Sequence, residues 1–516
     1  MYKNMIDFFE DTVKKYPDKI CIIDGERTLT FQELQERGEE IADTILQESK
    51  EAKNRPVAVF LPKCLEVYAI DIACTYSGNI FMNLDIKTPM ARIKNIIELI
   101  QPVLLITNER YKNALLEIAG DIPIIDVETI SEQKVSANKE LLESRRREMI
   151  DTDPFCIINT SGSTGTPKGV VLNHRSFFDF LNWSIEKFHF DGTECIGALS
   201  PVVFDIYEYE LCLMMKLGSR IVLLDSMLAV YPAKLLQYVR DQRVNFIFWV
   251  PSIMVNIANM NLLEKIPLND LKHVWFAGEV FPTKQFNYWQ RMLPDATFTN
   301  LYGPIEITLD CTYFTVNRTF EDSEPLPIGY ACENTDVMLL NDEDVLCKNN
   351  EIGELCVRGT SLAMGYYNNP EKTRSAFVQN PLNSHYPELI YRTGDLAFVN
   401  NKGEIIFKGR KDSLIKHMGY RIELGEIEHV LIDTLHLVQY ACVVYQYERK
   451  EITLFYEPKD EITDVEIRKA LSDVFPRYMI PTVYHCMEKL PRNTNGKIDR
   501  LFLSKKVNDS DSGQDC

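Results

Sequence analysis

Short apolar runs alternate with longer amphipathic segments over the first 300 residues, and this alternation constrains the fold most. The apolar runs typical of strands are 20–24, 56–61, 102–107, 123–127, 155–160, 243–252, 271–281 and 296–304. The segments with helical spacing are 5–16, 30–46 and 64–78. Thr30 and Glu33 have the spacing of a capping box before the second of these helices. Since strands joined by helices run parallel, the sequence predicts an α/β fold whose large N-terminal domain contains βαβ-type sheets.

The pattern changes beyond about residue 325. Short apolar runs with glycine turns follow at 336–340, 352–359 and 397–410, and Asn-Lys-Gly at 401–403 predicts a hairpin. We therefore expect a β-rich subdomain. Beyond it, helical and strand patterns mix over about 100 residues, enough for a small mobile α+β domain. The predicted organisation is a large domain at 1–411, a small domain at 412–505 and a disordered polar tail at 506–516.

Composition excludes several classes of partner and location. The 516 residues exceed what one compact core holds, and 75 acidic against 56 basic side chains give a formal net charge of −19. This charge argues against binding to nucleic acid or to an anionic membrane. The thirteen cysteines include no Cys-x-x-Cys pair, which favours reduced thiols in a cytoplasm. Neither a signal peptide nor an uncharged apolar run of membrane-spanning length is present in the sequence.

The stretch 160-TSGSTGTPKG-169 lies between two apolar runs and concentrates glycines, hydroxyls and one cation. Glycine turns let amide groups converge on one point, hydroxyls add donors, and Lys168 adds a positive charge, which together suit a phosphate. A solvated Ser/Gly linker is the alternative. The stretch lacks the Gly-Lys-Ser/Thr order of the P-loop, because Lys168 is followed by Gly169.

Four further motifs follow this loop in the chain. They are 300-NLYGPIEIT-308, 391-YRTGDLA-397, 409-GRKDSLIKHMGYRIELGEIE-428 and 491-PRNTNGKIDR-500. In this order, over essentially the whole chain, they resemble the adenylate-forming superfamily of nonribosomal peptide adenylation domains, acyl-CoA synthetases and luciferases. With 275-WFAGEVFP-282, the chain is similar to freestanding amino-acid-activating members such as D-alanine–carrier protein ligases. The resemblance implies that a carboxylate attacks ATP, that pyrophosphate leaves, and that a thiol then displaces AMP from the acyl-adenylate.

The resemblance also assigns the residues that bind ATP and Mg²⁺. Glu306 would bind Mg²⁺, Tyr302 would stack on adenine, Asn300 would bond the adenine edge, and Asp395 with Arg410 would hold the ribose. The residues expected around the nucleotide are Thr160, Ser161, Gly162, Ser163, Thr164, Gly165, Lys168, Gly278, Asn300, Tyr302, Gly303, Asp395 and Arg410.

Three more assignments belong to the expected small domain. Lys497 would be catalytic, since the corresponding lysine of the family binds the substrate carboxylate and the α-phosphate. Asp412 matches the family hinge, and the strand around Gly419 would line the approach of the thiol. Catalysis by positioning and charge needs no nucleophile on the enzyme, and the sequence contains no Gly-x-Ser-x-Gly.

Asp205 follows Phe204, and in amino-acid-activating members an aspartate at this place pairs with the substrate α-ammonium. An aspartate that caps the next helix is the alternative. The expected pocket residues are Asp205, Ile206, Tyr209, Trp249, Trp275, Ala277, Leu301, Leu309 and Asp310. The two tryptophans favour a small side chain, whereas Asp310 favours a cationic one, and the sequence leaves both open. Ile305 stands where the family usually has Thr, and Tyr207 where it favours Ser.

The sequence contains no carrier domain, so the expected thiol acceptor is the phosphopantetheine of a separate carrier protein. The leading hypothesis is therefore an amino-acid–carrier protein ligase. An acyl- or aryl-CoA synthetase that uses free CoA is the first alternative. A non-catalytic nucleotide-binding homologue is the second, and Ile305 alone supports it.

Overall fold

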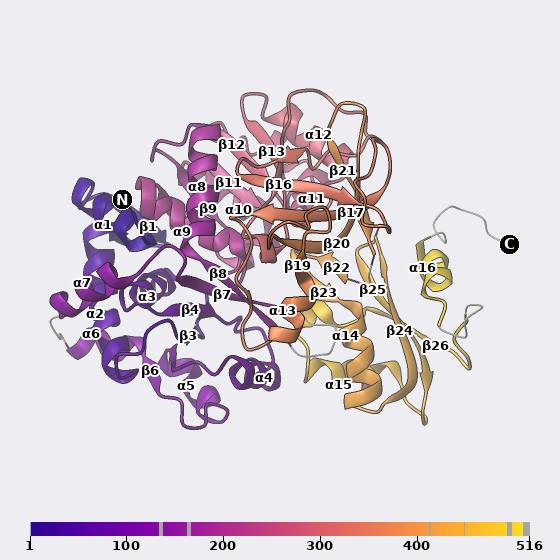
Figure 1. Ribbon diagram of the computed structural model, residues 1–516, viewed down its shortest axis with the longest axis horizontal. Helices are drawn as coiled ribbons and strands as arrows, with labels where there is room; N and C mark the ends of the chain where they lie inside the picture. Colours follow the sequence, from indigo (N-terminus) through magenta and orange to yellow (C-terminus); the bar gives the residue numbers. More distant parts are fainter. Residues whose placement is uncertain are drawn as a thin grey trace. The chain divides into compact units, whose positions relative to one another are not determined.

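The computed structural model describes residues 2–133, 138–161, 167–411, 414–447, 449–492 and 498–508 (Figure 1). The chain divides into two compact units. The first comprises Met1–Asp85, Ile100–Ile158 and Gly169–Lys411, and the second comprises Ile86–Leu99, Asn159–Lys168 and Asp412–Cys516.

A nine-stranded sheet forms the centre of the first unit, in the order β15-β14-β13-β12-β11-β9-β10-β1-β2. Its strands are β1 Ile20–Asp24, β2 Arg27–Thr30, β9 Cys195–Ala198, β10 Arg220–Leu223, β11 Phe246–Trp249, β12 His273–Phe276, β13 Thr297–Tyr302, β14 Thr312–Thr315 and β15 Tyr330–Ala331. The six strands from β13 to β1 run parallel, and the edge strands β2, β14 and β15 pair antiparallel. Because helices cover both faces, its central strands read as continuous apolar runs rather than alternating ones.

A seven-stranded sheet has the order β18-β8-β7-β4-β3-β5-β6. Its strands are β3 Pro56–Val59, β4 Ile80–Asn83, β5 Leu104–Thr107, β6 Ile124–Asp126, β7 Pro154–Thr160, β8 Lys168–Asn173 and β18 Gly365–Tyr366. Strands β7, β4, β3, β5 and β6 run parallel. The predicted α/β fold with βαβ-type sheets is confirmed.

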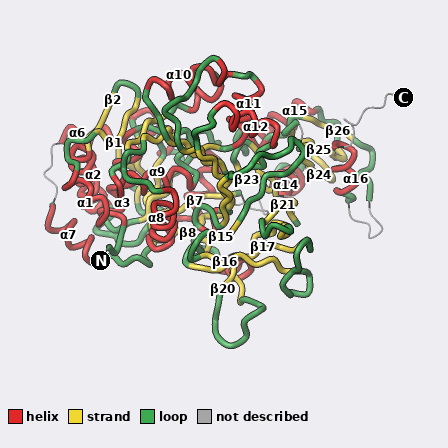
Figure 2. The backbone as a smooth tube through the Cα atoms, turned by 90° about the horizontal axis from the view of Figure 1, so that it is seen from above, coloured by secondary structure: helices red, strands yellow, loops and turns green. Residues whose placement is uncertain are grey.

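Helices cover both faces of the nine-stranded sheet (Figure 2). A hydrophobic core lies on each face, and the main core also includes residues of the seven-stranded sheet. The main core contains residues of α1 Met5–Lys15, α2 Phe31–Glu48, α3 Leu65–Tyr76, α8 His174–Phe188 and α9 Asp205–Leu217. The other core lies under α10 Pro232–Asp241, α11 Pro251–Asn259 and α12 Thr283–Met292. The remaining helices up to residue 376 are α4 Met90–Ile100, α5 Glu109–Leu116, α6 Val127–Gln133, α7 Lys139–Glu148 and α13 Pro370–Ala376. Thr30 and Glu33 form the predicted capping box of α2.

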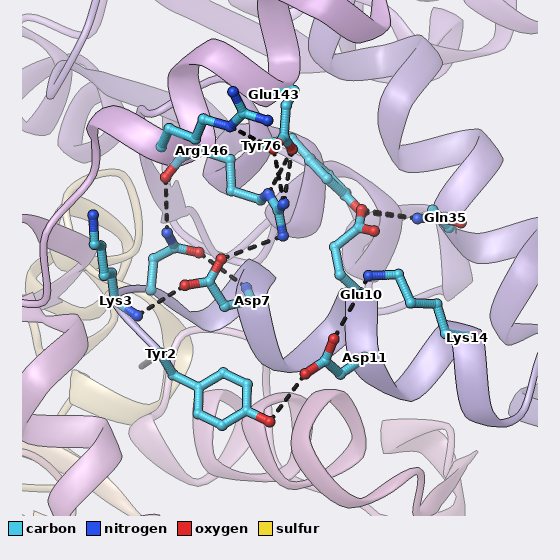
Figure 3. Close-up of polar contacts among 12 residues, drawn as sticks. Tyr2, Lys3, Asp7, Glu10, Asp11, Lys14, Gln35, Tyr76, Glu143 and Arg146 are labelled. Atoms are coloured by element: carbon cyan, nitrogen blue, oxygen red, sulfur yellow. Dashed lines mark hydrogen bonds and ion pairs between the residues drawn. The ribbon is translucent and has the colours of Figure 1, made fainter.

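Charged side chains bind α1 to its neighbours (Figure 3). Arg146 of α7 pairs with Glu143 at 2.8 Å and with Asp7 of α1 at 3.4 Å. Glu10 of α1 accepts hydrogen bonds from the Tyr76 hydroxyl of α3, at 2.6 Å, and from a side chain of α2. Arg146 of the charged helix α7 therefore forms its ion pairs within the protein.

The predicted β-rich subdomain is an antiparallel five-stranded sheet, in which β16-β17-β20-β19 are adjacent and β21 pairs with β20. Its strands are β16 Thr335–Leu340, β17 Gly353–Gly359, β19 Phe377–Gln379, β20 Leu389–Val399 and β21 Ile405–Arg410. The β20–β21 hairpin turns at the predicted Asn-Lys-Gly, where Gly403 has a φ of +77°.

The second unit contains a short hairpin and a three-stranded sheet with helices. The strands are β22 Leu414–His417, β23 Tyr420–Glu423, β24 Val438–Gln446, β25 Glu451–Pro458 and β26 Val483–Cys486. The helices are α14 Leu424–His429, α15 Asp464–Ser472 and α16 Arg500–Asn508, together with most of α4, and Val430–Thr434 is π-helical. The tail prediction began too early, since α16 reaches Asn508, and 509–516 lie outside the described residues. No described helix is both long and apolar enough to cross a membrane.

Candidate active site

The segments expected to bind substrate follow the carboxyl ends of parallel strands of the nine-stranded sheet. Asp205 follows β9 after a short loop, Ala277 and Gly278 follow β12, and Tyr302 ends β13. In sheets of this kind, ligands bind beyond the carboxyl ends of the strands. The candidate substrate residues therefore lie together at the carboxyl ends of the strands of one sheet.

Tyr302 and Asp395 are buried, and they form a hydrogen-bonded group with Arg410. Arg410 Nη1 donates to Asp395 Oδ1 at 2.6 Å, and the Tyr302 hydroxyl donates to Asp395 Oδ2. Arg410 Nη2 also donates to the Thr393 carbonyl at 3.0 Å. Burial holds the pKa of Tyr302 well above its usual range and the Asp395 charge adds to this, so the phenol remains a proton donor. The structure thus brings together three of the predicted nucleotide residues.

Asn300 lies two residues before Tyr302 on β13 and is also buried. Its Nδ2 donates to the Pro327 carbonyl at 2.7 Å. This contact holds the carboxamide in one orientation near the end of the strand. Its expected hydrogen bond to adenine stays a prediction.

Gly303 lies where only glycine fits. A Cβ at this position would lie 2.1 Å from the Leu309 carbonyl oxygen, because the chain folds back beside it. The returning segment is closed by a hydrogen bond from the Cys311 amide to the Tyr302 carbonyl at 2.8 Å. Thr308 and Leu309 both have positive φ, 53° and 67°, which is costly for residues with a Cβ. Such strain is typical of segments that hold a functional group in place.

Glu306 lies on the turn Ile305–Ile307 within this strained loop and is fully buried. Its Oε1 accepts a hydrogen bond from the Tyr366 hydroxyl at 2.8 Å. One carboxylate fits Mg²⁺, which is held by one or two carboxylates together with substrate phosphates. Among the described residues, no group of three or more His, Cys, Asp or Glu side chains could hold a metal. Glu306 would supply one carboxylate to such an ion.

Two of the predicted pocket residues, Tyr209 and Trp275, belong to a buried aromatic cluster. Tyr209 of α9 stacks on Trp275 of β12 with ring centroids 5.4 Å apart, and the Tyr209 hydroxyl bonds Ser184 at 3.1 Å. Phe248 of β11 meets Trp275 edge-on at 5.5 Å. The three aromatic side chains fill the space between α9 and the sheet.

Trp249 does not belong to this cluster. Adjacent residues of a strand point to opposite faces, so Phe248, which pairs with Trp275 in register, faces α9 while Trp249 faces away. Trp249 lies in the core under α10–α12, where its indole donates to the Gly197 carbonyl at 2.8 Å. Sequence reasoning missed Phe248, because strand alternation places residues 248 and 249 on opposite faces but does not show which of them faces Trp275.

Asp205 is the first residue of α9, and the N-cap position belongs to Phe204. A carboxylate here lies at the positive end of the helix dipole. The other predicted pocket residues are buried, namely Ile206, Ala277, Leu301, Leu309 and Asp310.

The unusual Tyr207 is fully buried on α9. Its hydroxyl donates to Asp71 of α3 at 2.6 Å, and Asn83 donates to the same carboxyl oxygen at 2.9 Å. Burial raises the pKa of Asp71 to about 7, and these two hydrogen bonds oppose the rise. Tyr207 therefore ties the first turn of α9 to α3.

The second unit contains the remaining predictions. Ser161 Oγ donates to the Arg421 carbonyl at 2.7 Å, and Lys168 Nζ lies 2.7 Å from a Glu423 carboxylate oxygen. Thr160 is buried at the end of β7, and Gly419 turns β22 into β23 with a φ of +83°. The predictions at Gly162, Ser163, Thr164, Gly165, Asp412 and Lys497 lie outside the described residues.

Comparison with known proteins shows the family of this chain. The family model for AMP-binding enzymes matches residues 9–367. The chain belongs to this family. It is 31% identical to a mycosubtilin synthase polypeptide of Bacillus subtilis over 97% of its length, and 30% identical to zwittermicin A synthase ZmaJ of Bacillus cereus over 96%. It spans 19% of the first relative and 94% of the second.

Among solved structures, the fold of this AMP-binding enzyme is similar to that of the Vibrio cholerae adenylation domain AlmE in complex with glycyl-adenosine-5′-phosphate. The TM-score is 0.84 at 20% identity, and the match covers 98% of each chain. The predicted membership of the adenylate-forming superfamily is confirmed. The protein is an ATP-dependent, adenylate-forming enzyme of the type found in nonribosomal peptide synthetases.

Proposed function

We propose that this AMP-binding enzyme activates a small amino acid as its aminoacyl-adenylate and transfers it to the phosphopantetheine thiol of a separate carrier protein. The carrying observation is Asp205 at the start of α9, a carboxylate at the same sheet edge as Tyr302. An amino acid needs such an anion for its ammonium group, whereas a simple acyl or aryl acid does not.

The aromatic cluster supports a small side chain. Trp275 is fully buried and in ring contact with Tyr209 and Phe248, so a substrate side chain that reached these rings would find little free volume. The glycyl-adenylate in the AlmE complex is consistent with a pocket of this kind in the fold. Asp310 is also buried, so a cationic side chain that would pair with its carboxylate is the competing proposal.

In the first half-reaction, a carboxylate oxygen of the amino acid attacks the α-phosphorus and the bond to pyrophosphate breaks. Asp395 and Arg410 would hold the ribose end, and Asp205 the ammonium end, so that the reacting atoms are held in line. Mg²⁺ at Glu306 would offset charge on the phosphate oxygens. Lys497 would bind the α-phosphate and the carboxylate. In the second half-reaction, the carrier thiolate attacks the acyl carbon and AMP leaves.

Pyrophosphate exchange with a panel of L-, D- and β-amino acids tests this function. Glycine or alanine should give the fastest ATP-dependent exchange, and Asp205→Ala should abolish it. Fastest exchange with lysine or ornithine would favour the Asp310 proposal. Exchange with acyl or aryl acids alone, followed by loading onto free CoA, would refute amino acid activation.

A further inference from the structure

Lys63 links the seven-stranded sheet to the loop that directly precedes Asp205. It lies between β3 and α3, at the carboxyl end of β3. Its Nζ donates to the Ala198 carbonyl at 2.8 Å and to the Ser200 carbonyl at 2.7 Å. Ala198 ends β9, and α9 begins at Asp205, so both bonds fix the loop directly before Asp205.

Glu210 is the titratable group that acts on Lys63. It is fully buried on α9, and neither carboxylate oxygen has a hydrogen-bond partner within the described part of the chain. Burial raises the pKa of Glu210 to about 8, and the charge of Lys63 opposes this rise. Burial lowers the pKa of Lys63 to about 8, and Glu210 opposes that change in turn. Lys63 thus contacts the loop through two hydrogen bonds, whereas it acts on Glu210 only through its charge.

We propose that Lys63 is a positioning residue for the amino acid end of the site. By holding the carbonyls of Ala198 and Ser200, it fixes the start of α9 and hence the location of the Asp205 carboxylate. This inference rests on the proposed role of Asp205. The nucleotide residues Tyr302 and Asp395 are hydrogen-bonded to each other on β13 and β20, so the effect of Lys63 should be confined to the amino acid.

The competing explanation is that Lys63 only neutralises Glu210. The two explanations differ for Lys63→Met combined with Glu210→Met, which removes the buried carboxylate but leaves the loop carbonyls without their donor. Replacing both partners of a buried pair by apolar groups is close to neutral for stability. The double variant should therefore fold even if Lys63→Met alone does not, and it can then be assayed in place of the single variant.

Steady-state pyrophosphate exchange measures the KM for the amino acid and the KM for ATP. We expect Lys63→Met, alone and in the double variant, to raise the KM for the amino acid about tenfold, the effect of losing one well-placed hydrogen-bonded contact. The KM for ATP should stay within about twofold, and Lys63→Arg, which keeps charge and donors, should restore most of the amino acid affinity. The matched control Glu210→Met should leave both constants near wild type. Recovery of amino acid KM in the double variant, or an equal rise in both constants, would overturn the proposal.

Amide hydrogen exchange tests the loop without any substrate. Peptides that cover residues 198–205 should exchange faster in the double variant than in Glu210→Met, because the loop has lost its ammonium donor. Unchanged exchange would overturn the role of Lys63. If the wild-type enzyme activates no amino acid, the proposed function fails, and this exchange measurement still decides whether Lys63 holds the loop.

Discussion

Asp395→Asn tests the nucleotide end of the site, because it removes a charge while keeping the shape of the side chain. The carboxylate is almost fully buried and accepts from Arg410 at 2.6 Å and from the Tyr302 hydroxyl. A carboxamide would offer one acceptor oxygen in place of two. Either the Arg410 contact or the Tyr302 contact would therefore be lost, and the ribose hydroxyls would face a neutral group.

The size of the effect follows from these contacts. A hydrogen bond to a charged group contributes about 1.5–3 kcal/mol, and about 1.4 kcal/mol changes an affinity tenfold. We expect the KM for ATP to rise about 10- to 100-fold in pyrophosphate exchange. The KM for the amino acid should change little, because Asp205 follows β9 whereas Asp395 lies on β20.

Glu404→Gln is the matched control. Glu404 is buried near the turn of the same β20–β21 hairpin, where it binds Arg318 through both carboxylate oxygens at 2.5 and 2.9 Å. Breaking this pair should lower the free energy of unfolding as much as Asp395→Asn does, yet leave the KM for ATP unchanged. An equal rise of KM in both variants would show that hairpin stability, rather than contact with the nucleotide, explains the Asp395 effect.

Three further predictions concern other parts of the chain. Lys497→Ala should abolish pyrophosphate exchange without changing the circular dichroism spectrum, and near-normal exchange would refute its catalytic role. Trp275→Leu should extend exchange to larger amino acids, because it removes ring volume beside Tyr209, and an unchanged substrate range would contradict the pocket assignment. His174 is buried and accepts a hydrogen bond from the Met5 amide at 3.3 Å, and burial lowers its pKa from 6.5 to about 3. The unfolded chain therefore binds a proton below pH 6.5 that the folded chain does not. This should remove roughly 2 kcal/mol of unfolding free energy between pH 6.5 and 5, measured by urea unfolding, and His174→Gln should abolish that part of the loss.

The secondary structure was predictable because its signals are local. The capping box of Thr30 and Glu33 and the hairpin at 401–403 depend on residues within a few positions of each other, and the structure contains both. The parallel sheets followed from the alternation of strand and helix patterns. The order of the strands did not follow, because it depends on contacts between distant segments.

The candidate site was predictable only in part, for a related reason. Matching positions along a motif identifies residues such as Asp395 but does not show which face of a strand a side chain occupies. The sequence prediction named Trp249 of β11 and not its neighbour Phe248. The two side chains lie in different cores, on opposite faces of the sheet. Pairing of β11 with β12 resolves this, and pairing is visible only in the structure.

Residues that hold the site in place are harder to recognise than those that contact ligands. Lys63 contacts carbonyls 135 and 137 residues away, and Tyr207 contacts a carboxyl group 136 residues away. Backbone carbonyls leave no mark in the sequence of the partner, so a lysine that holds them looks like any surface lysine. Tyr207 departs from the family pattern, and its contact with Asp71 shows that the larger side chain is used for packing and hydrogen bonding. A departure at a motif position is therefore weak support for loss of activity, since the new side chain can take a structural role in the same turn.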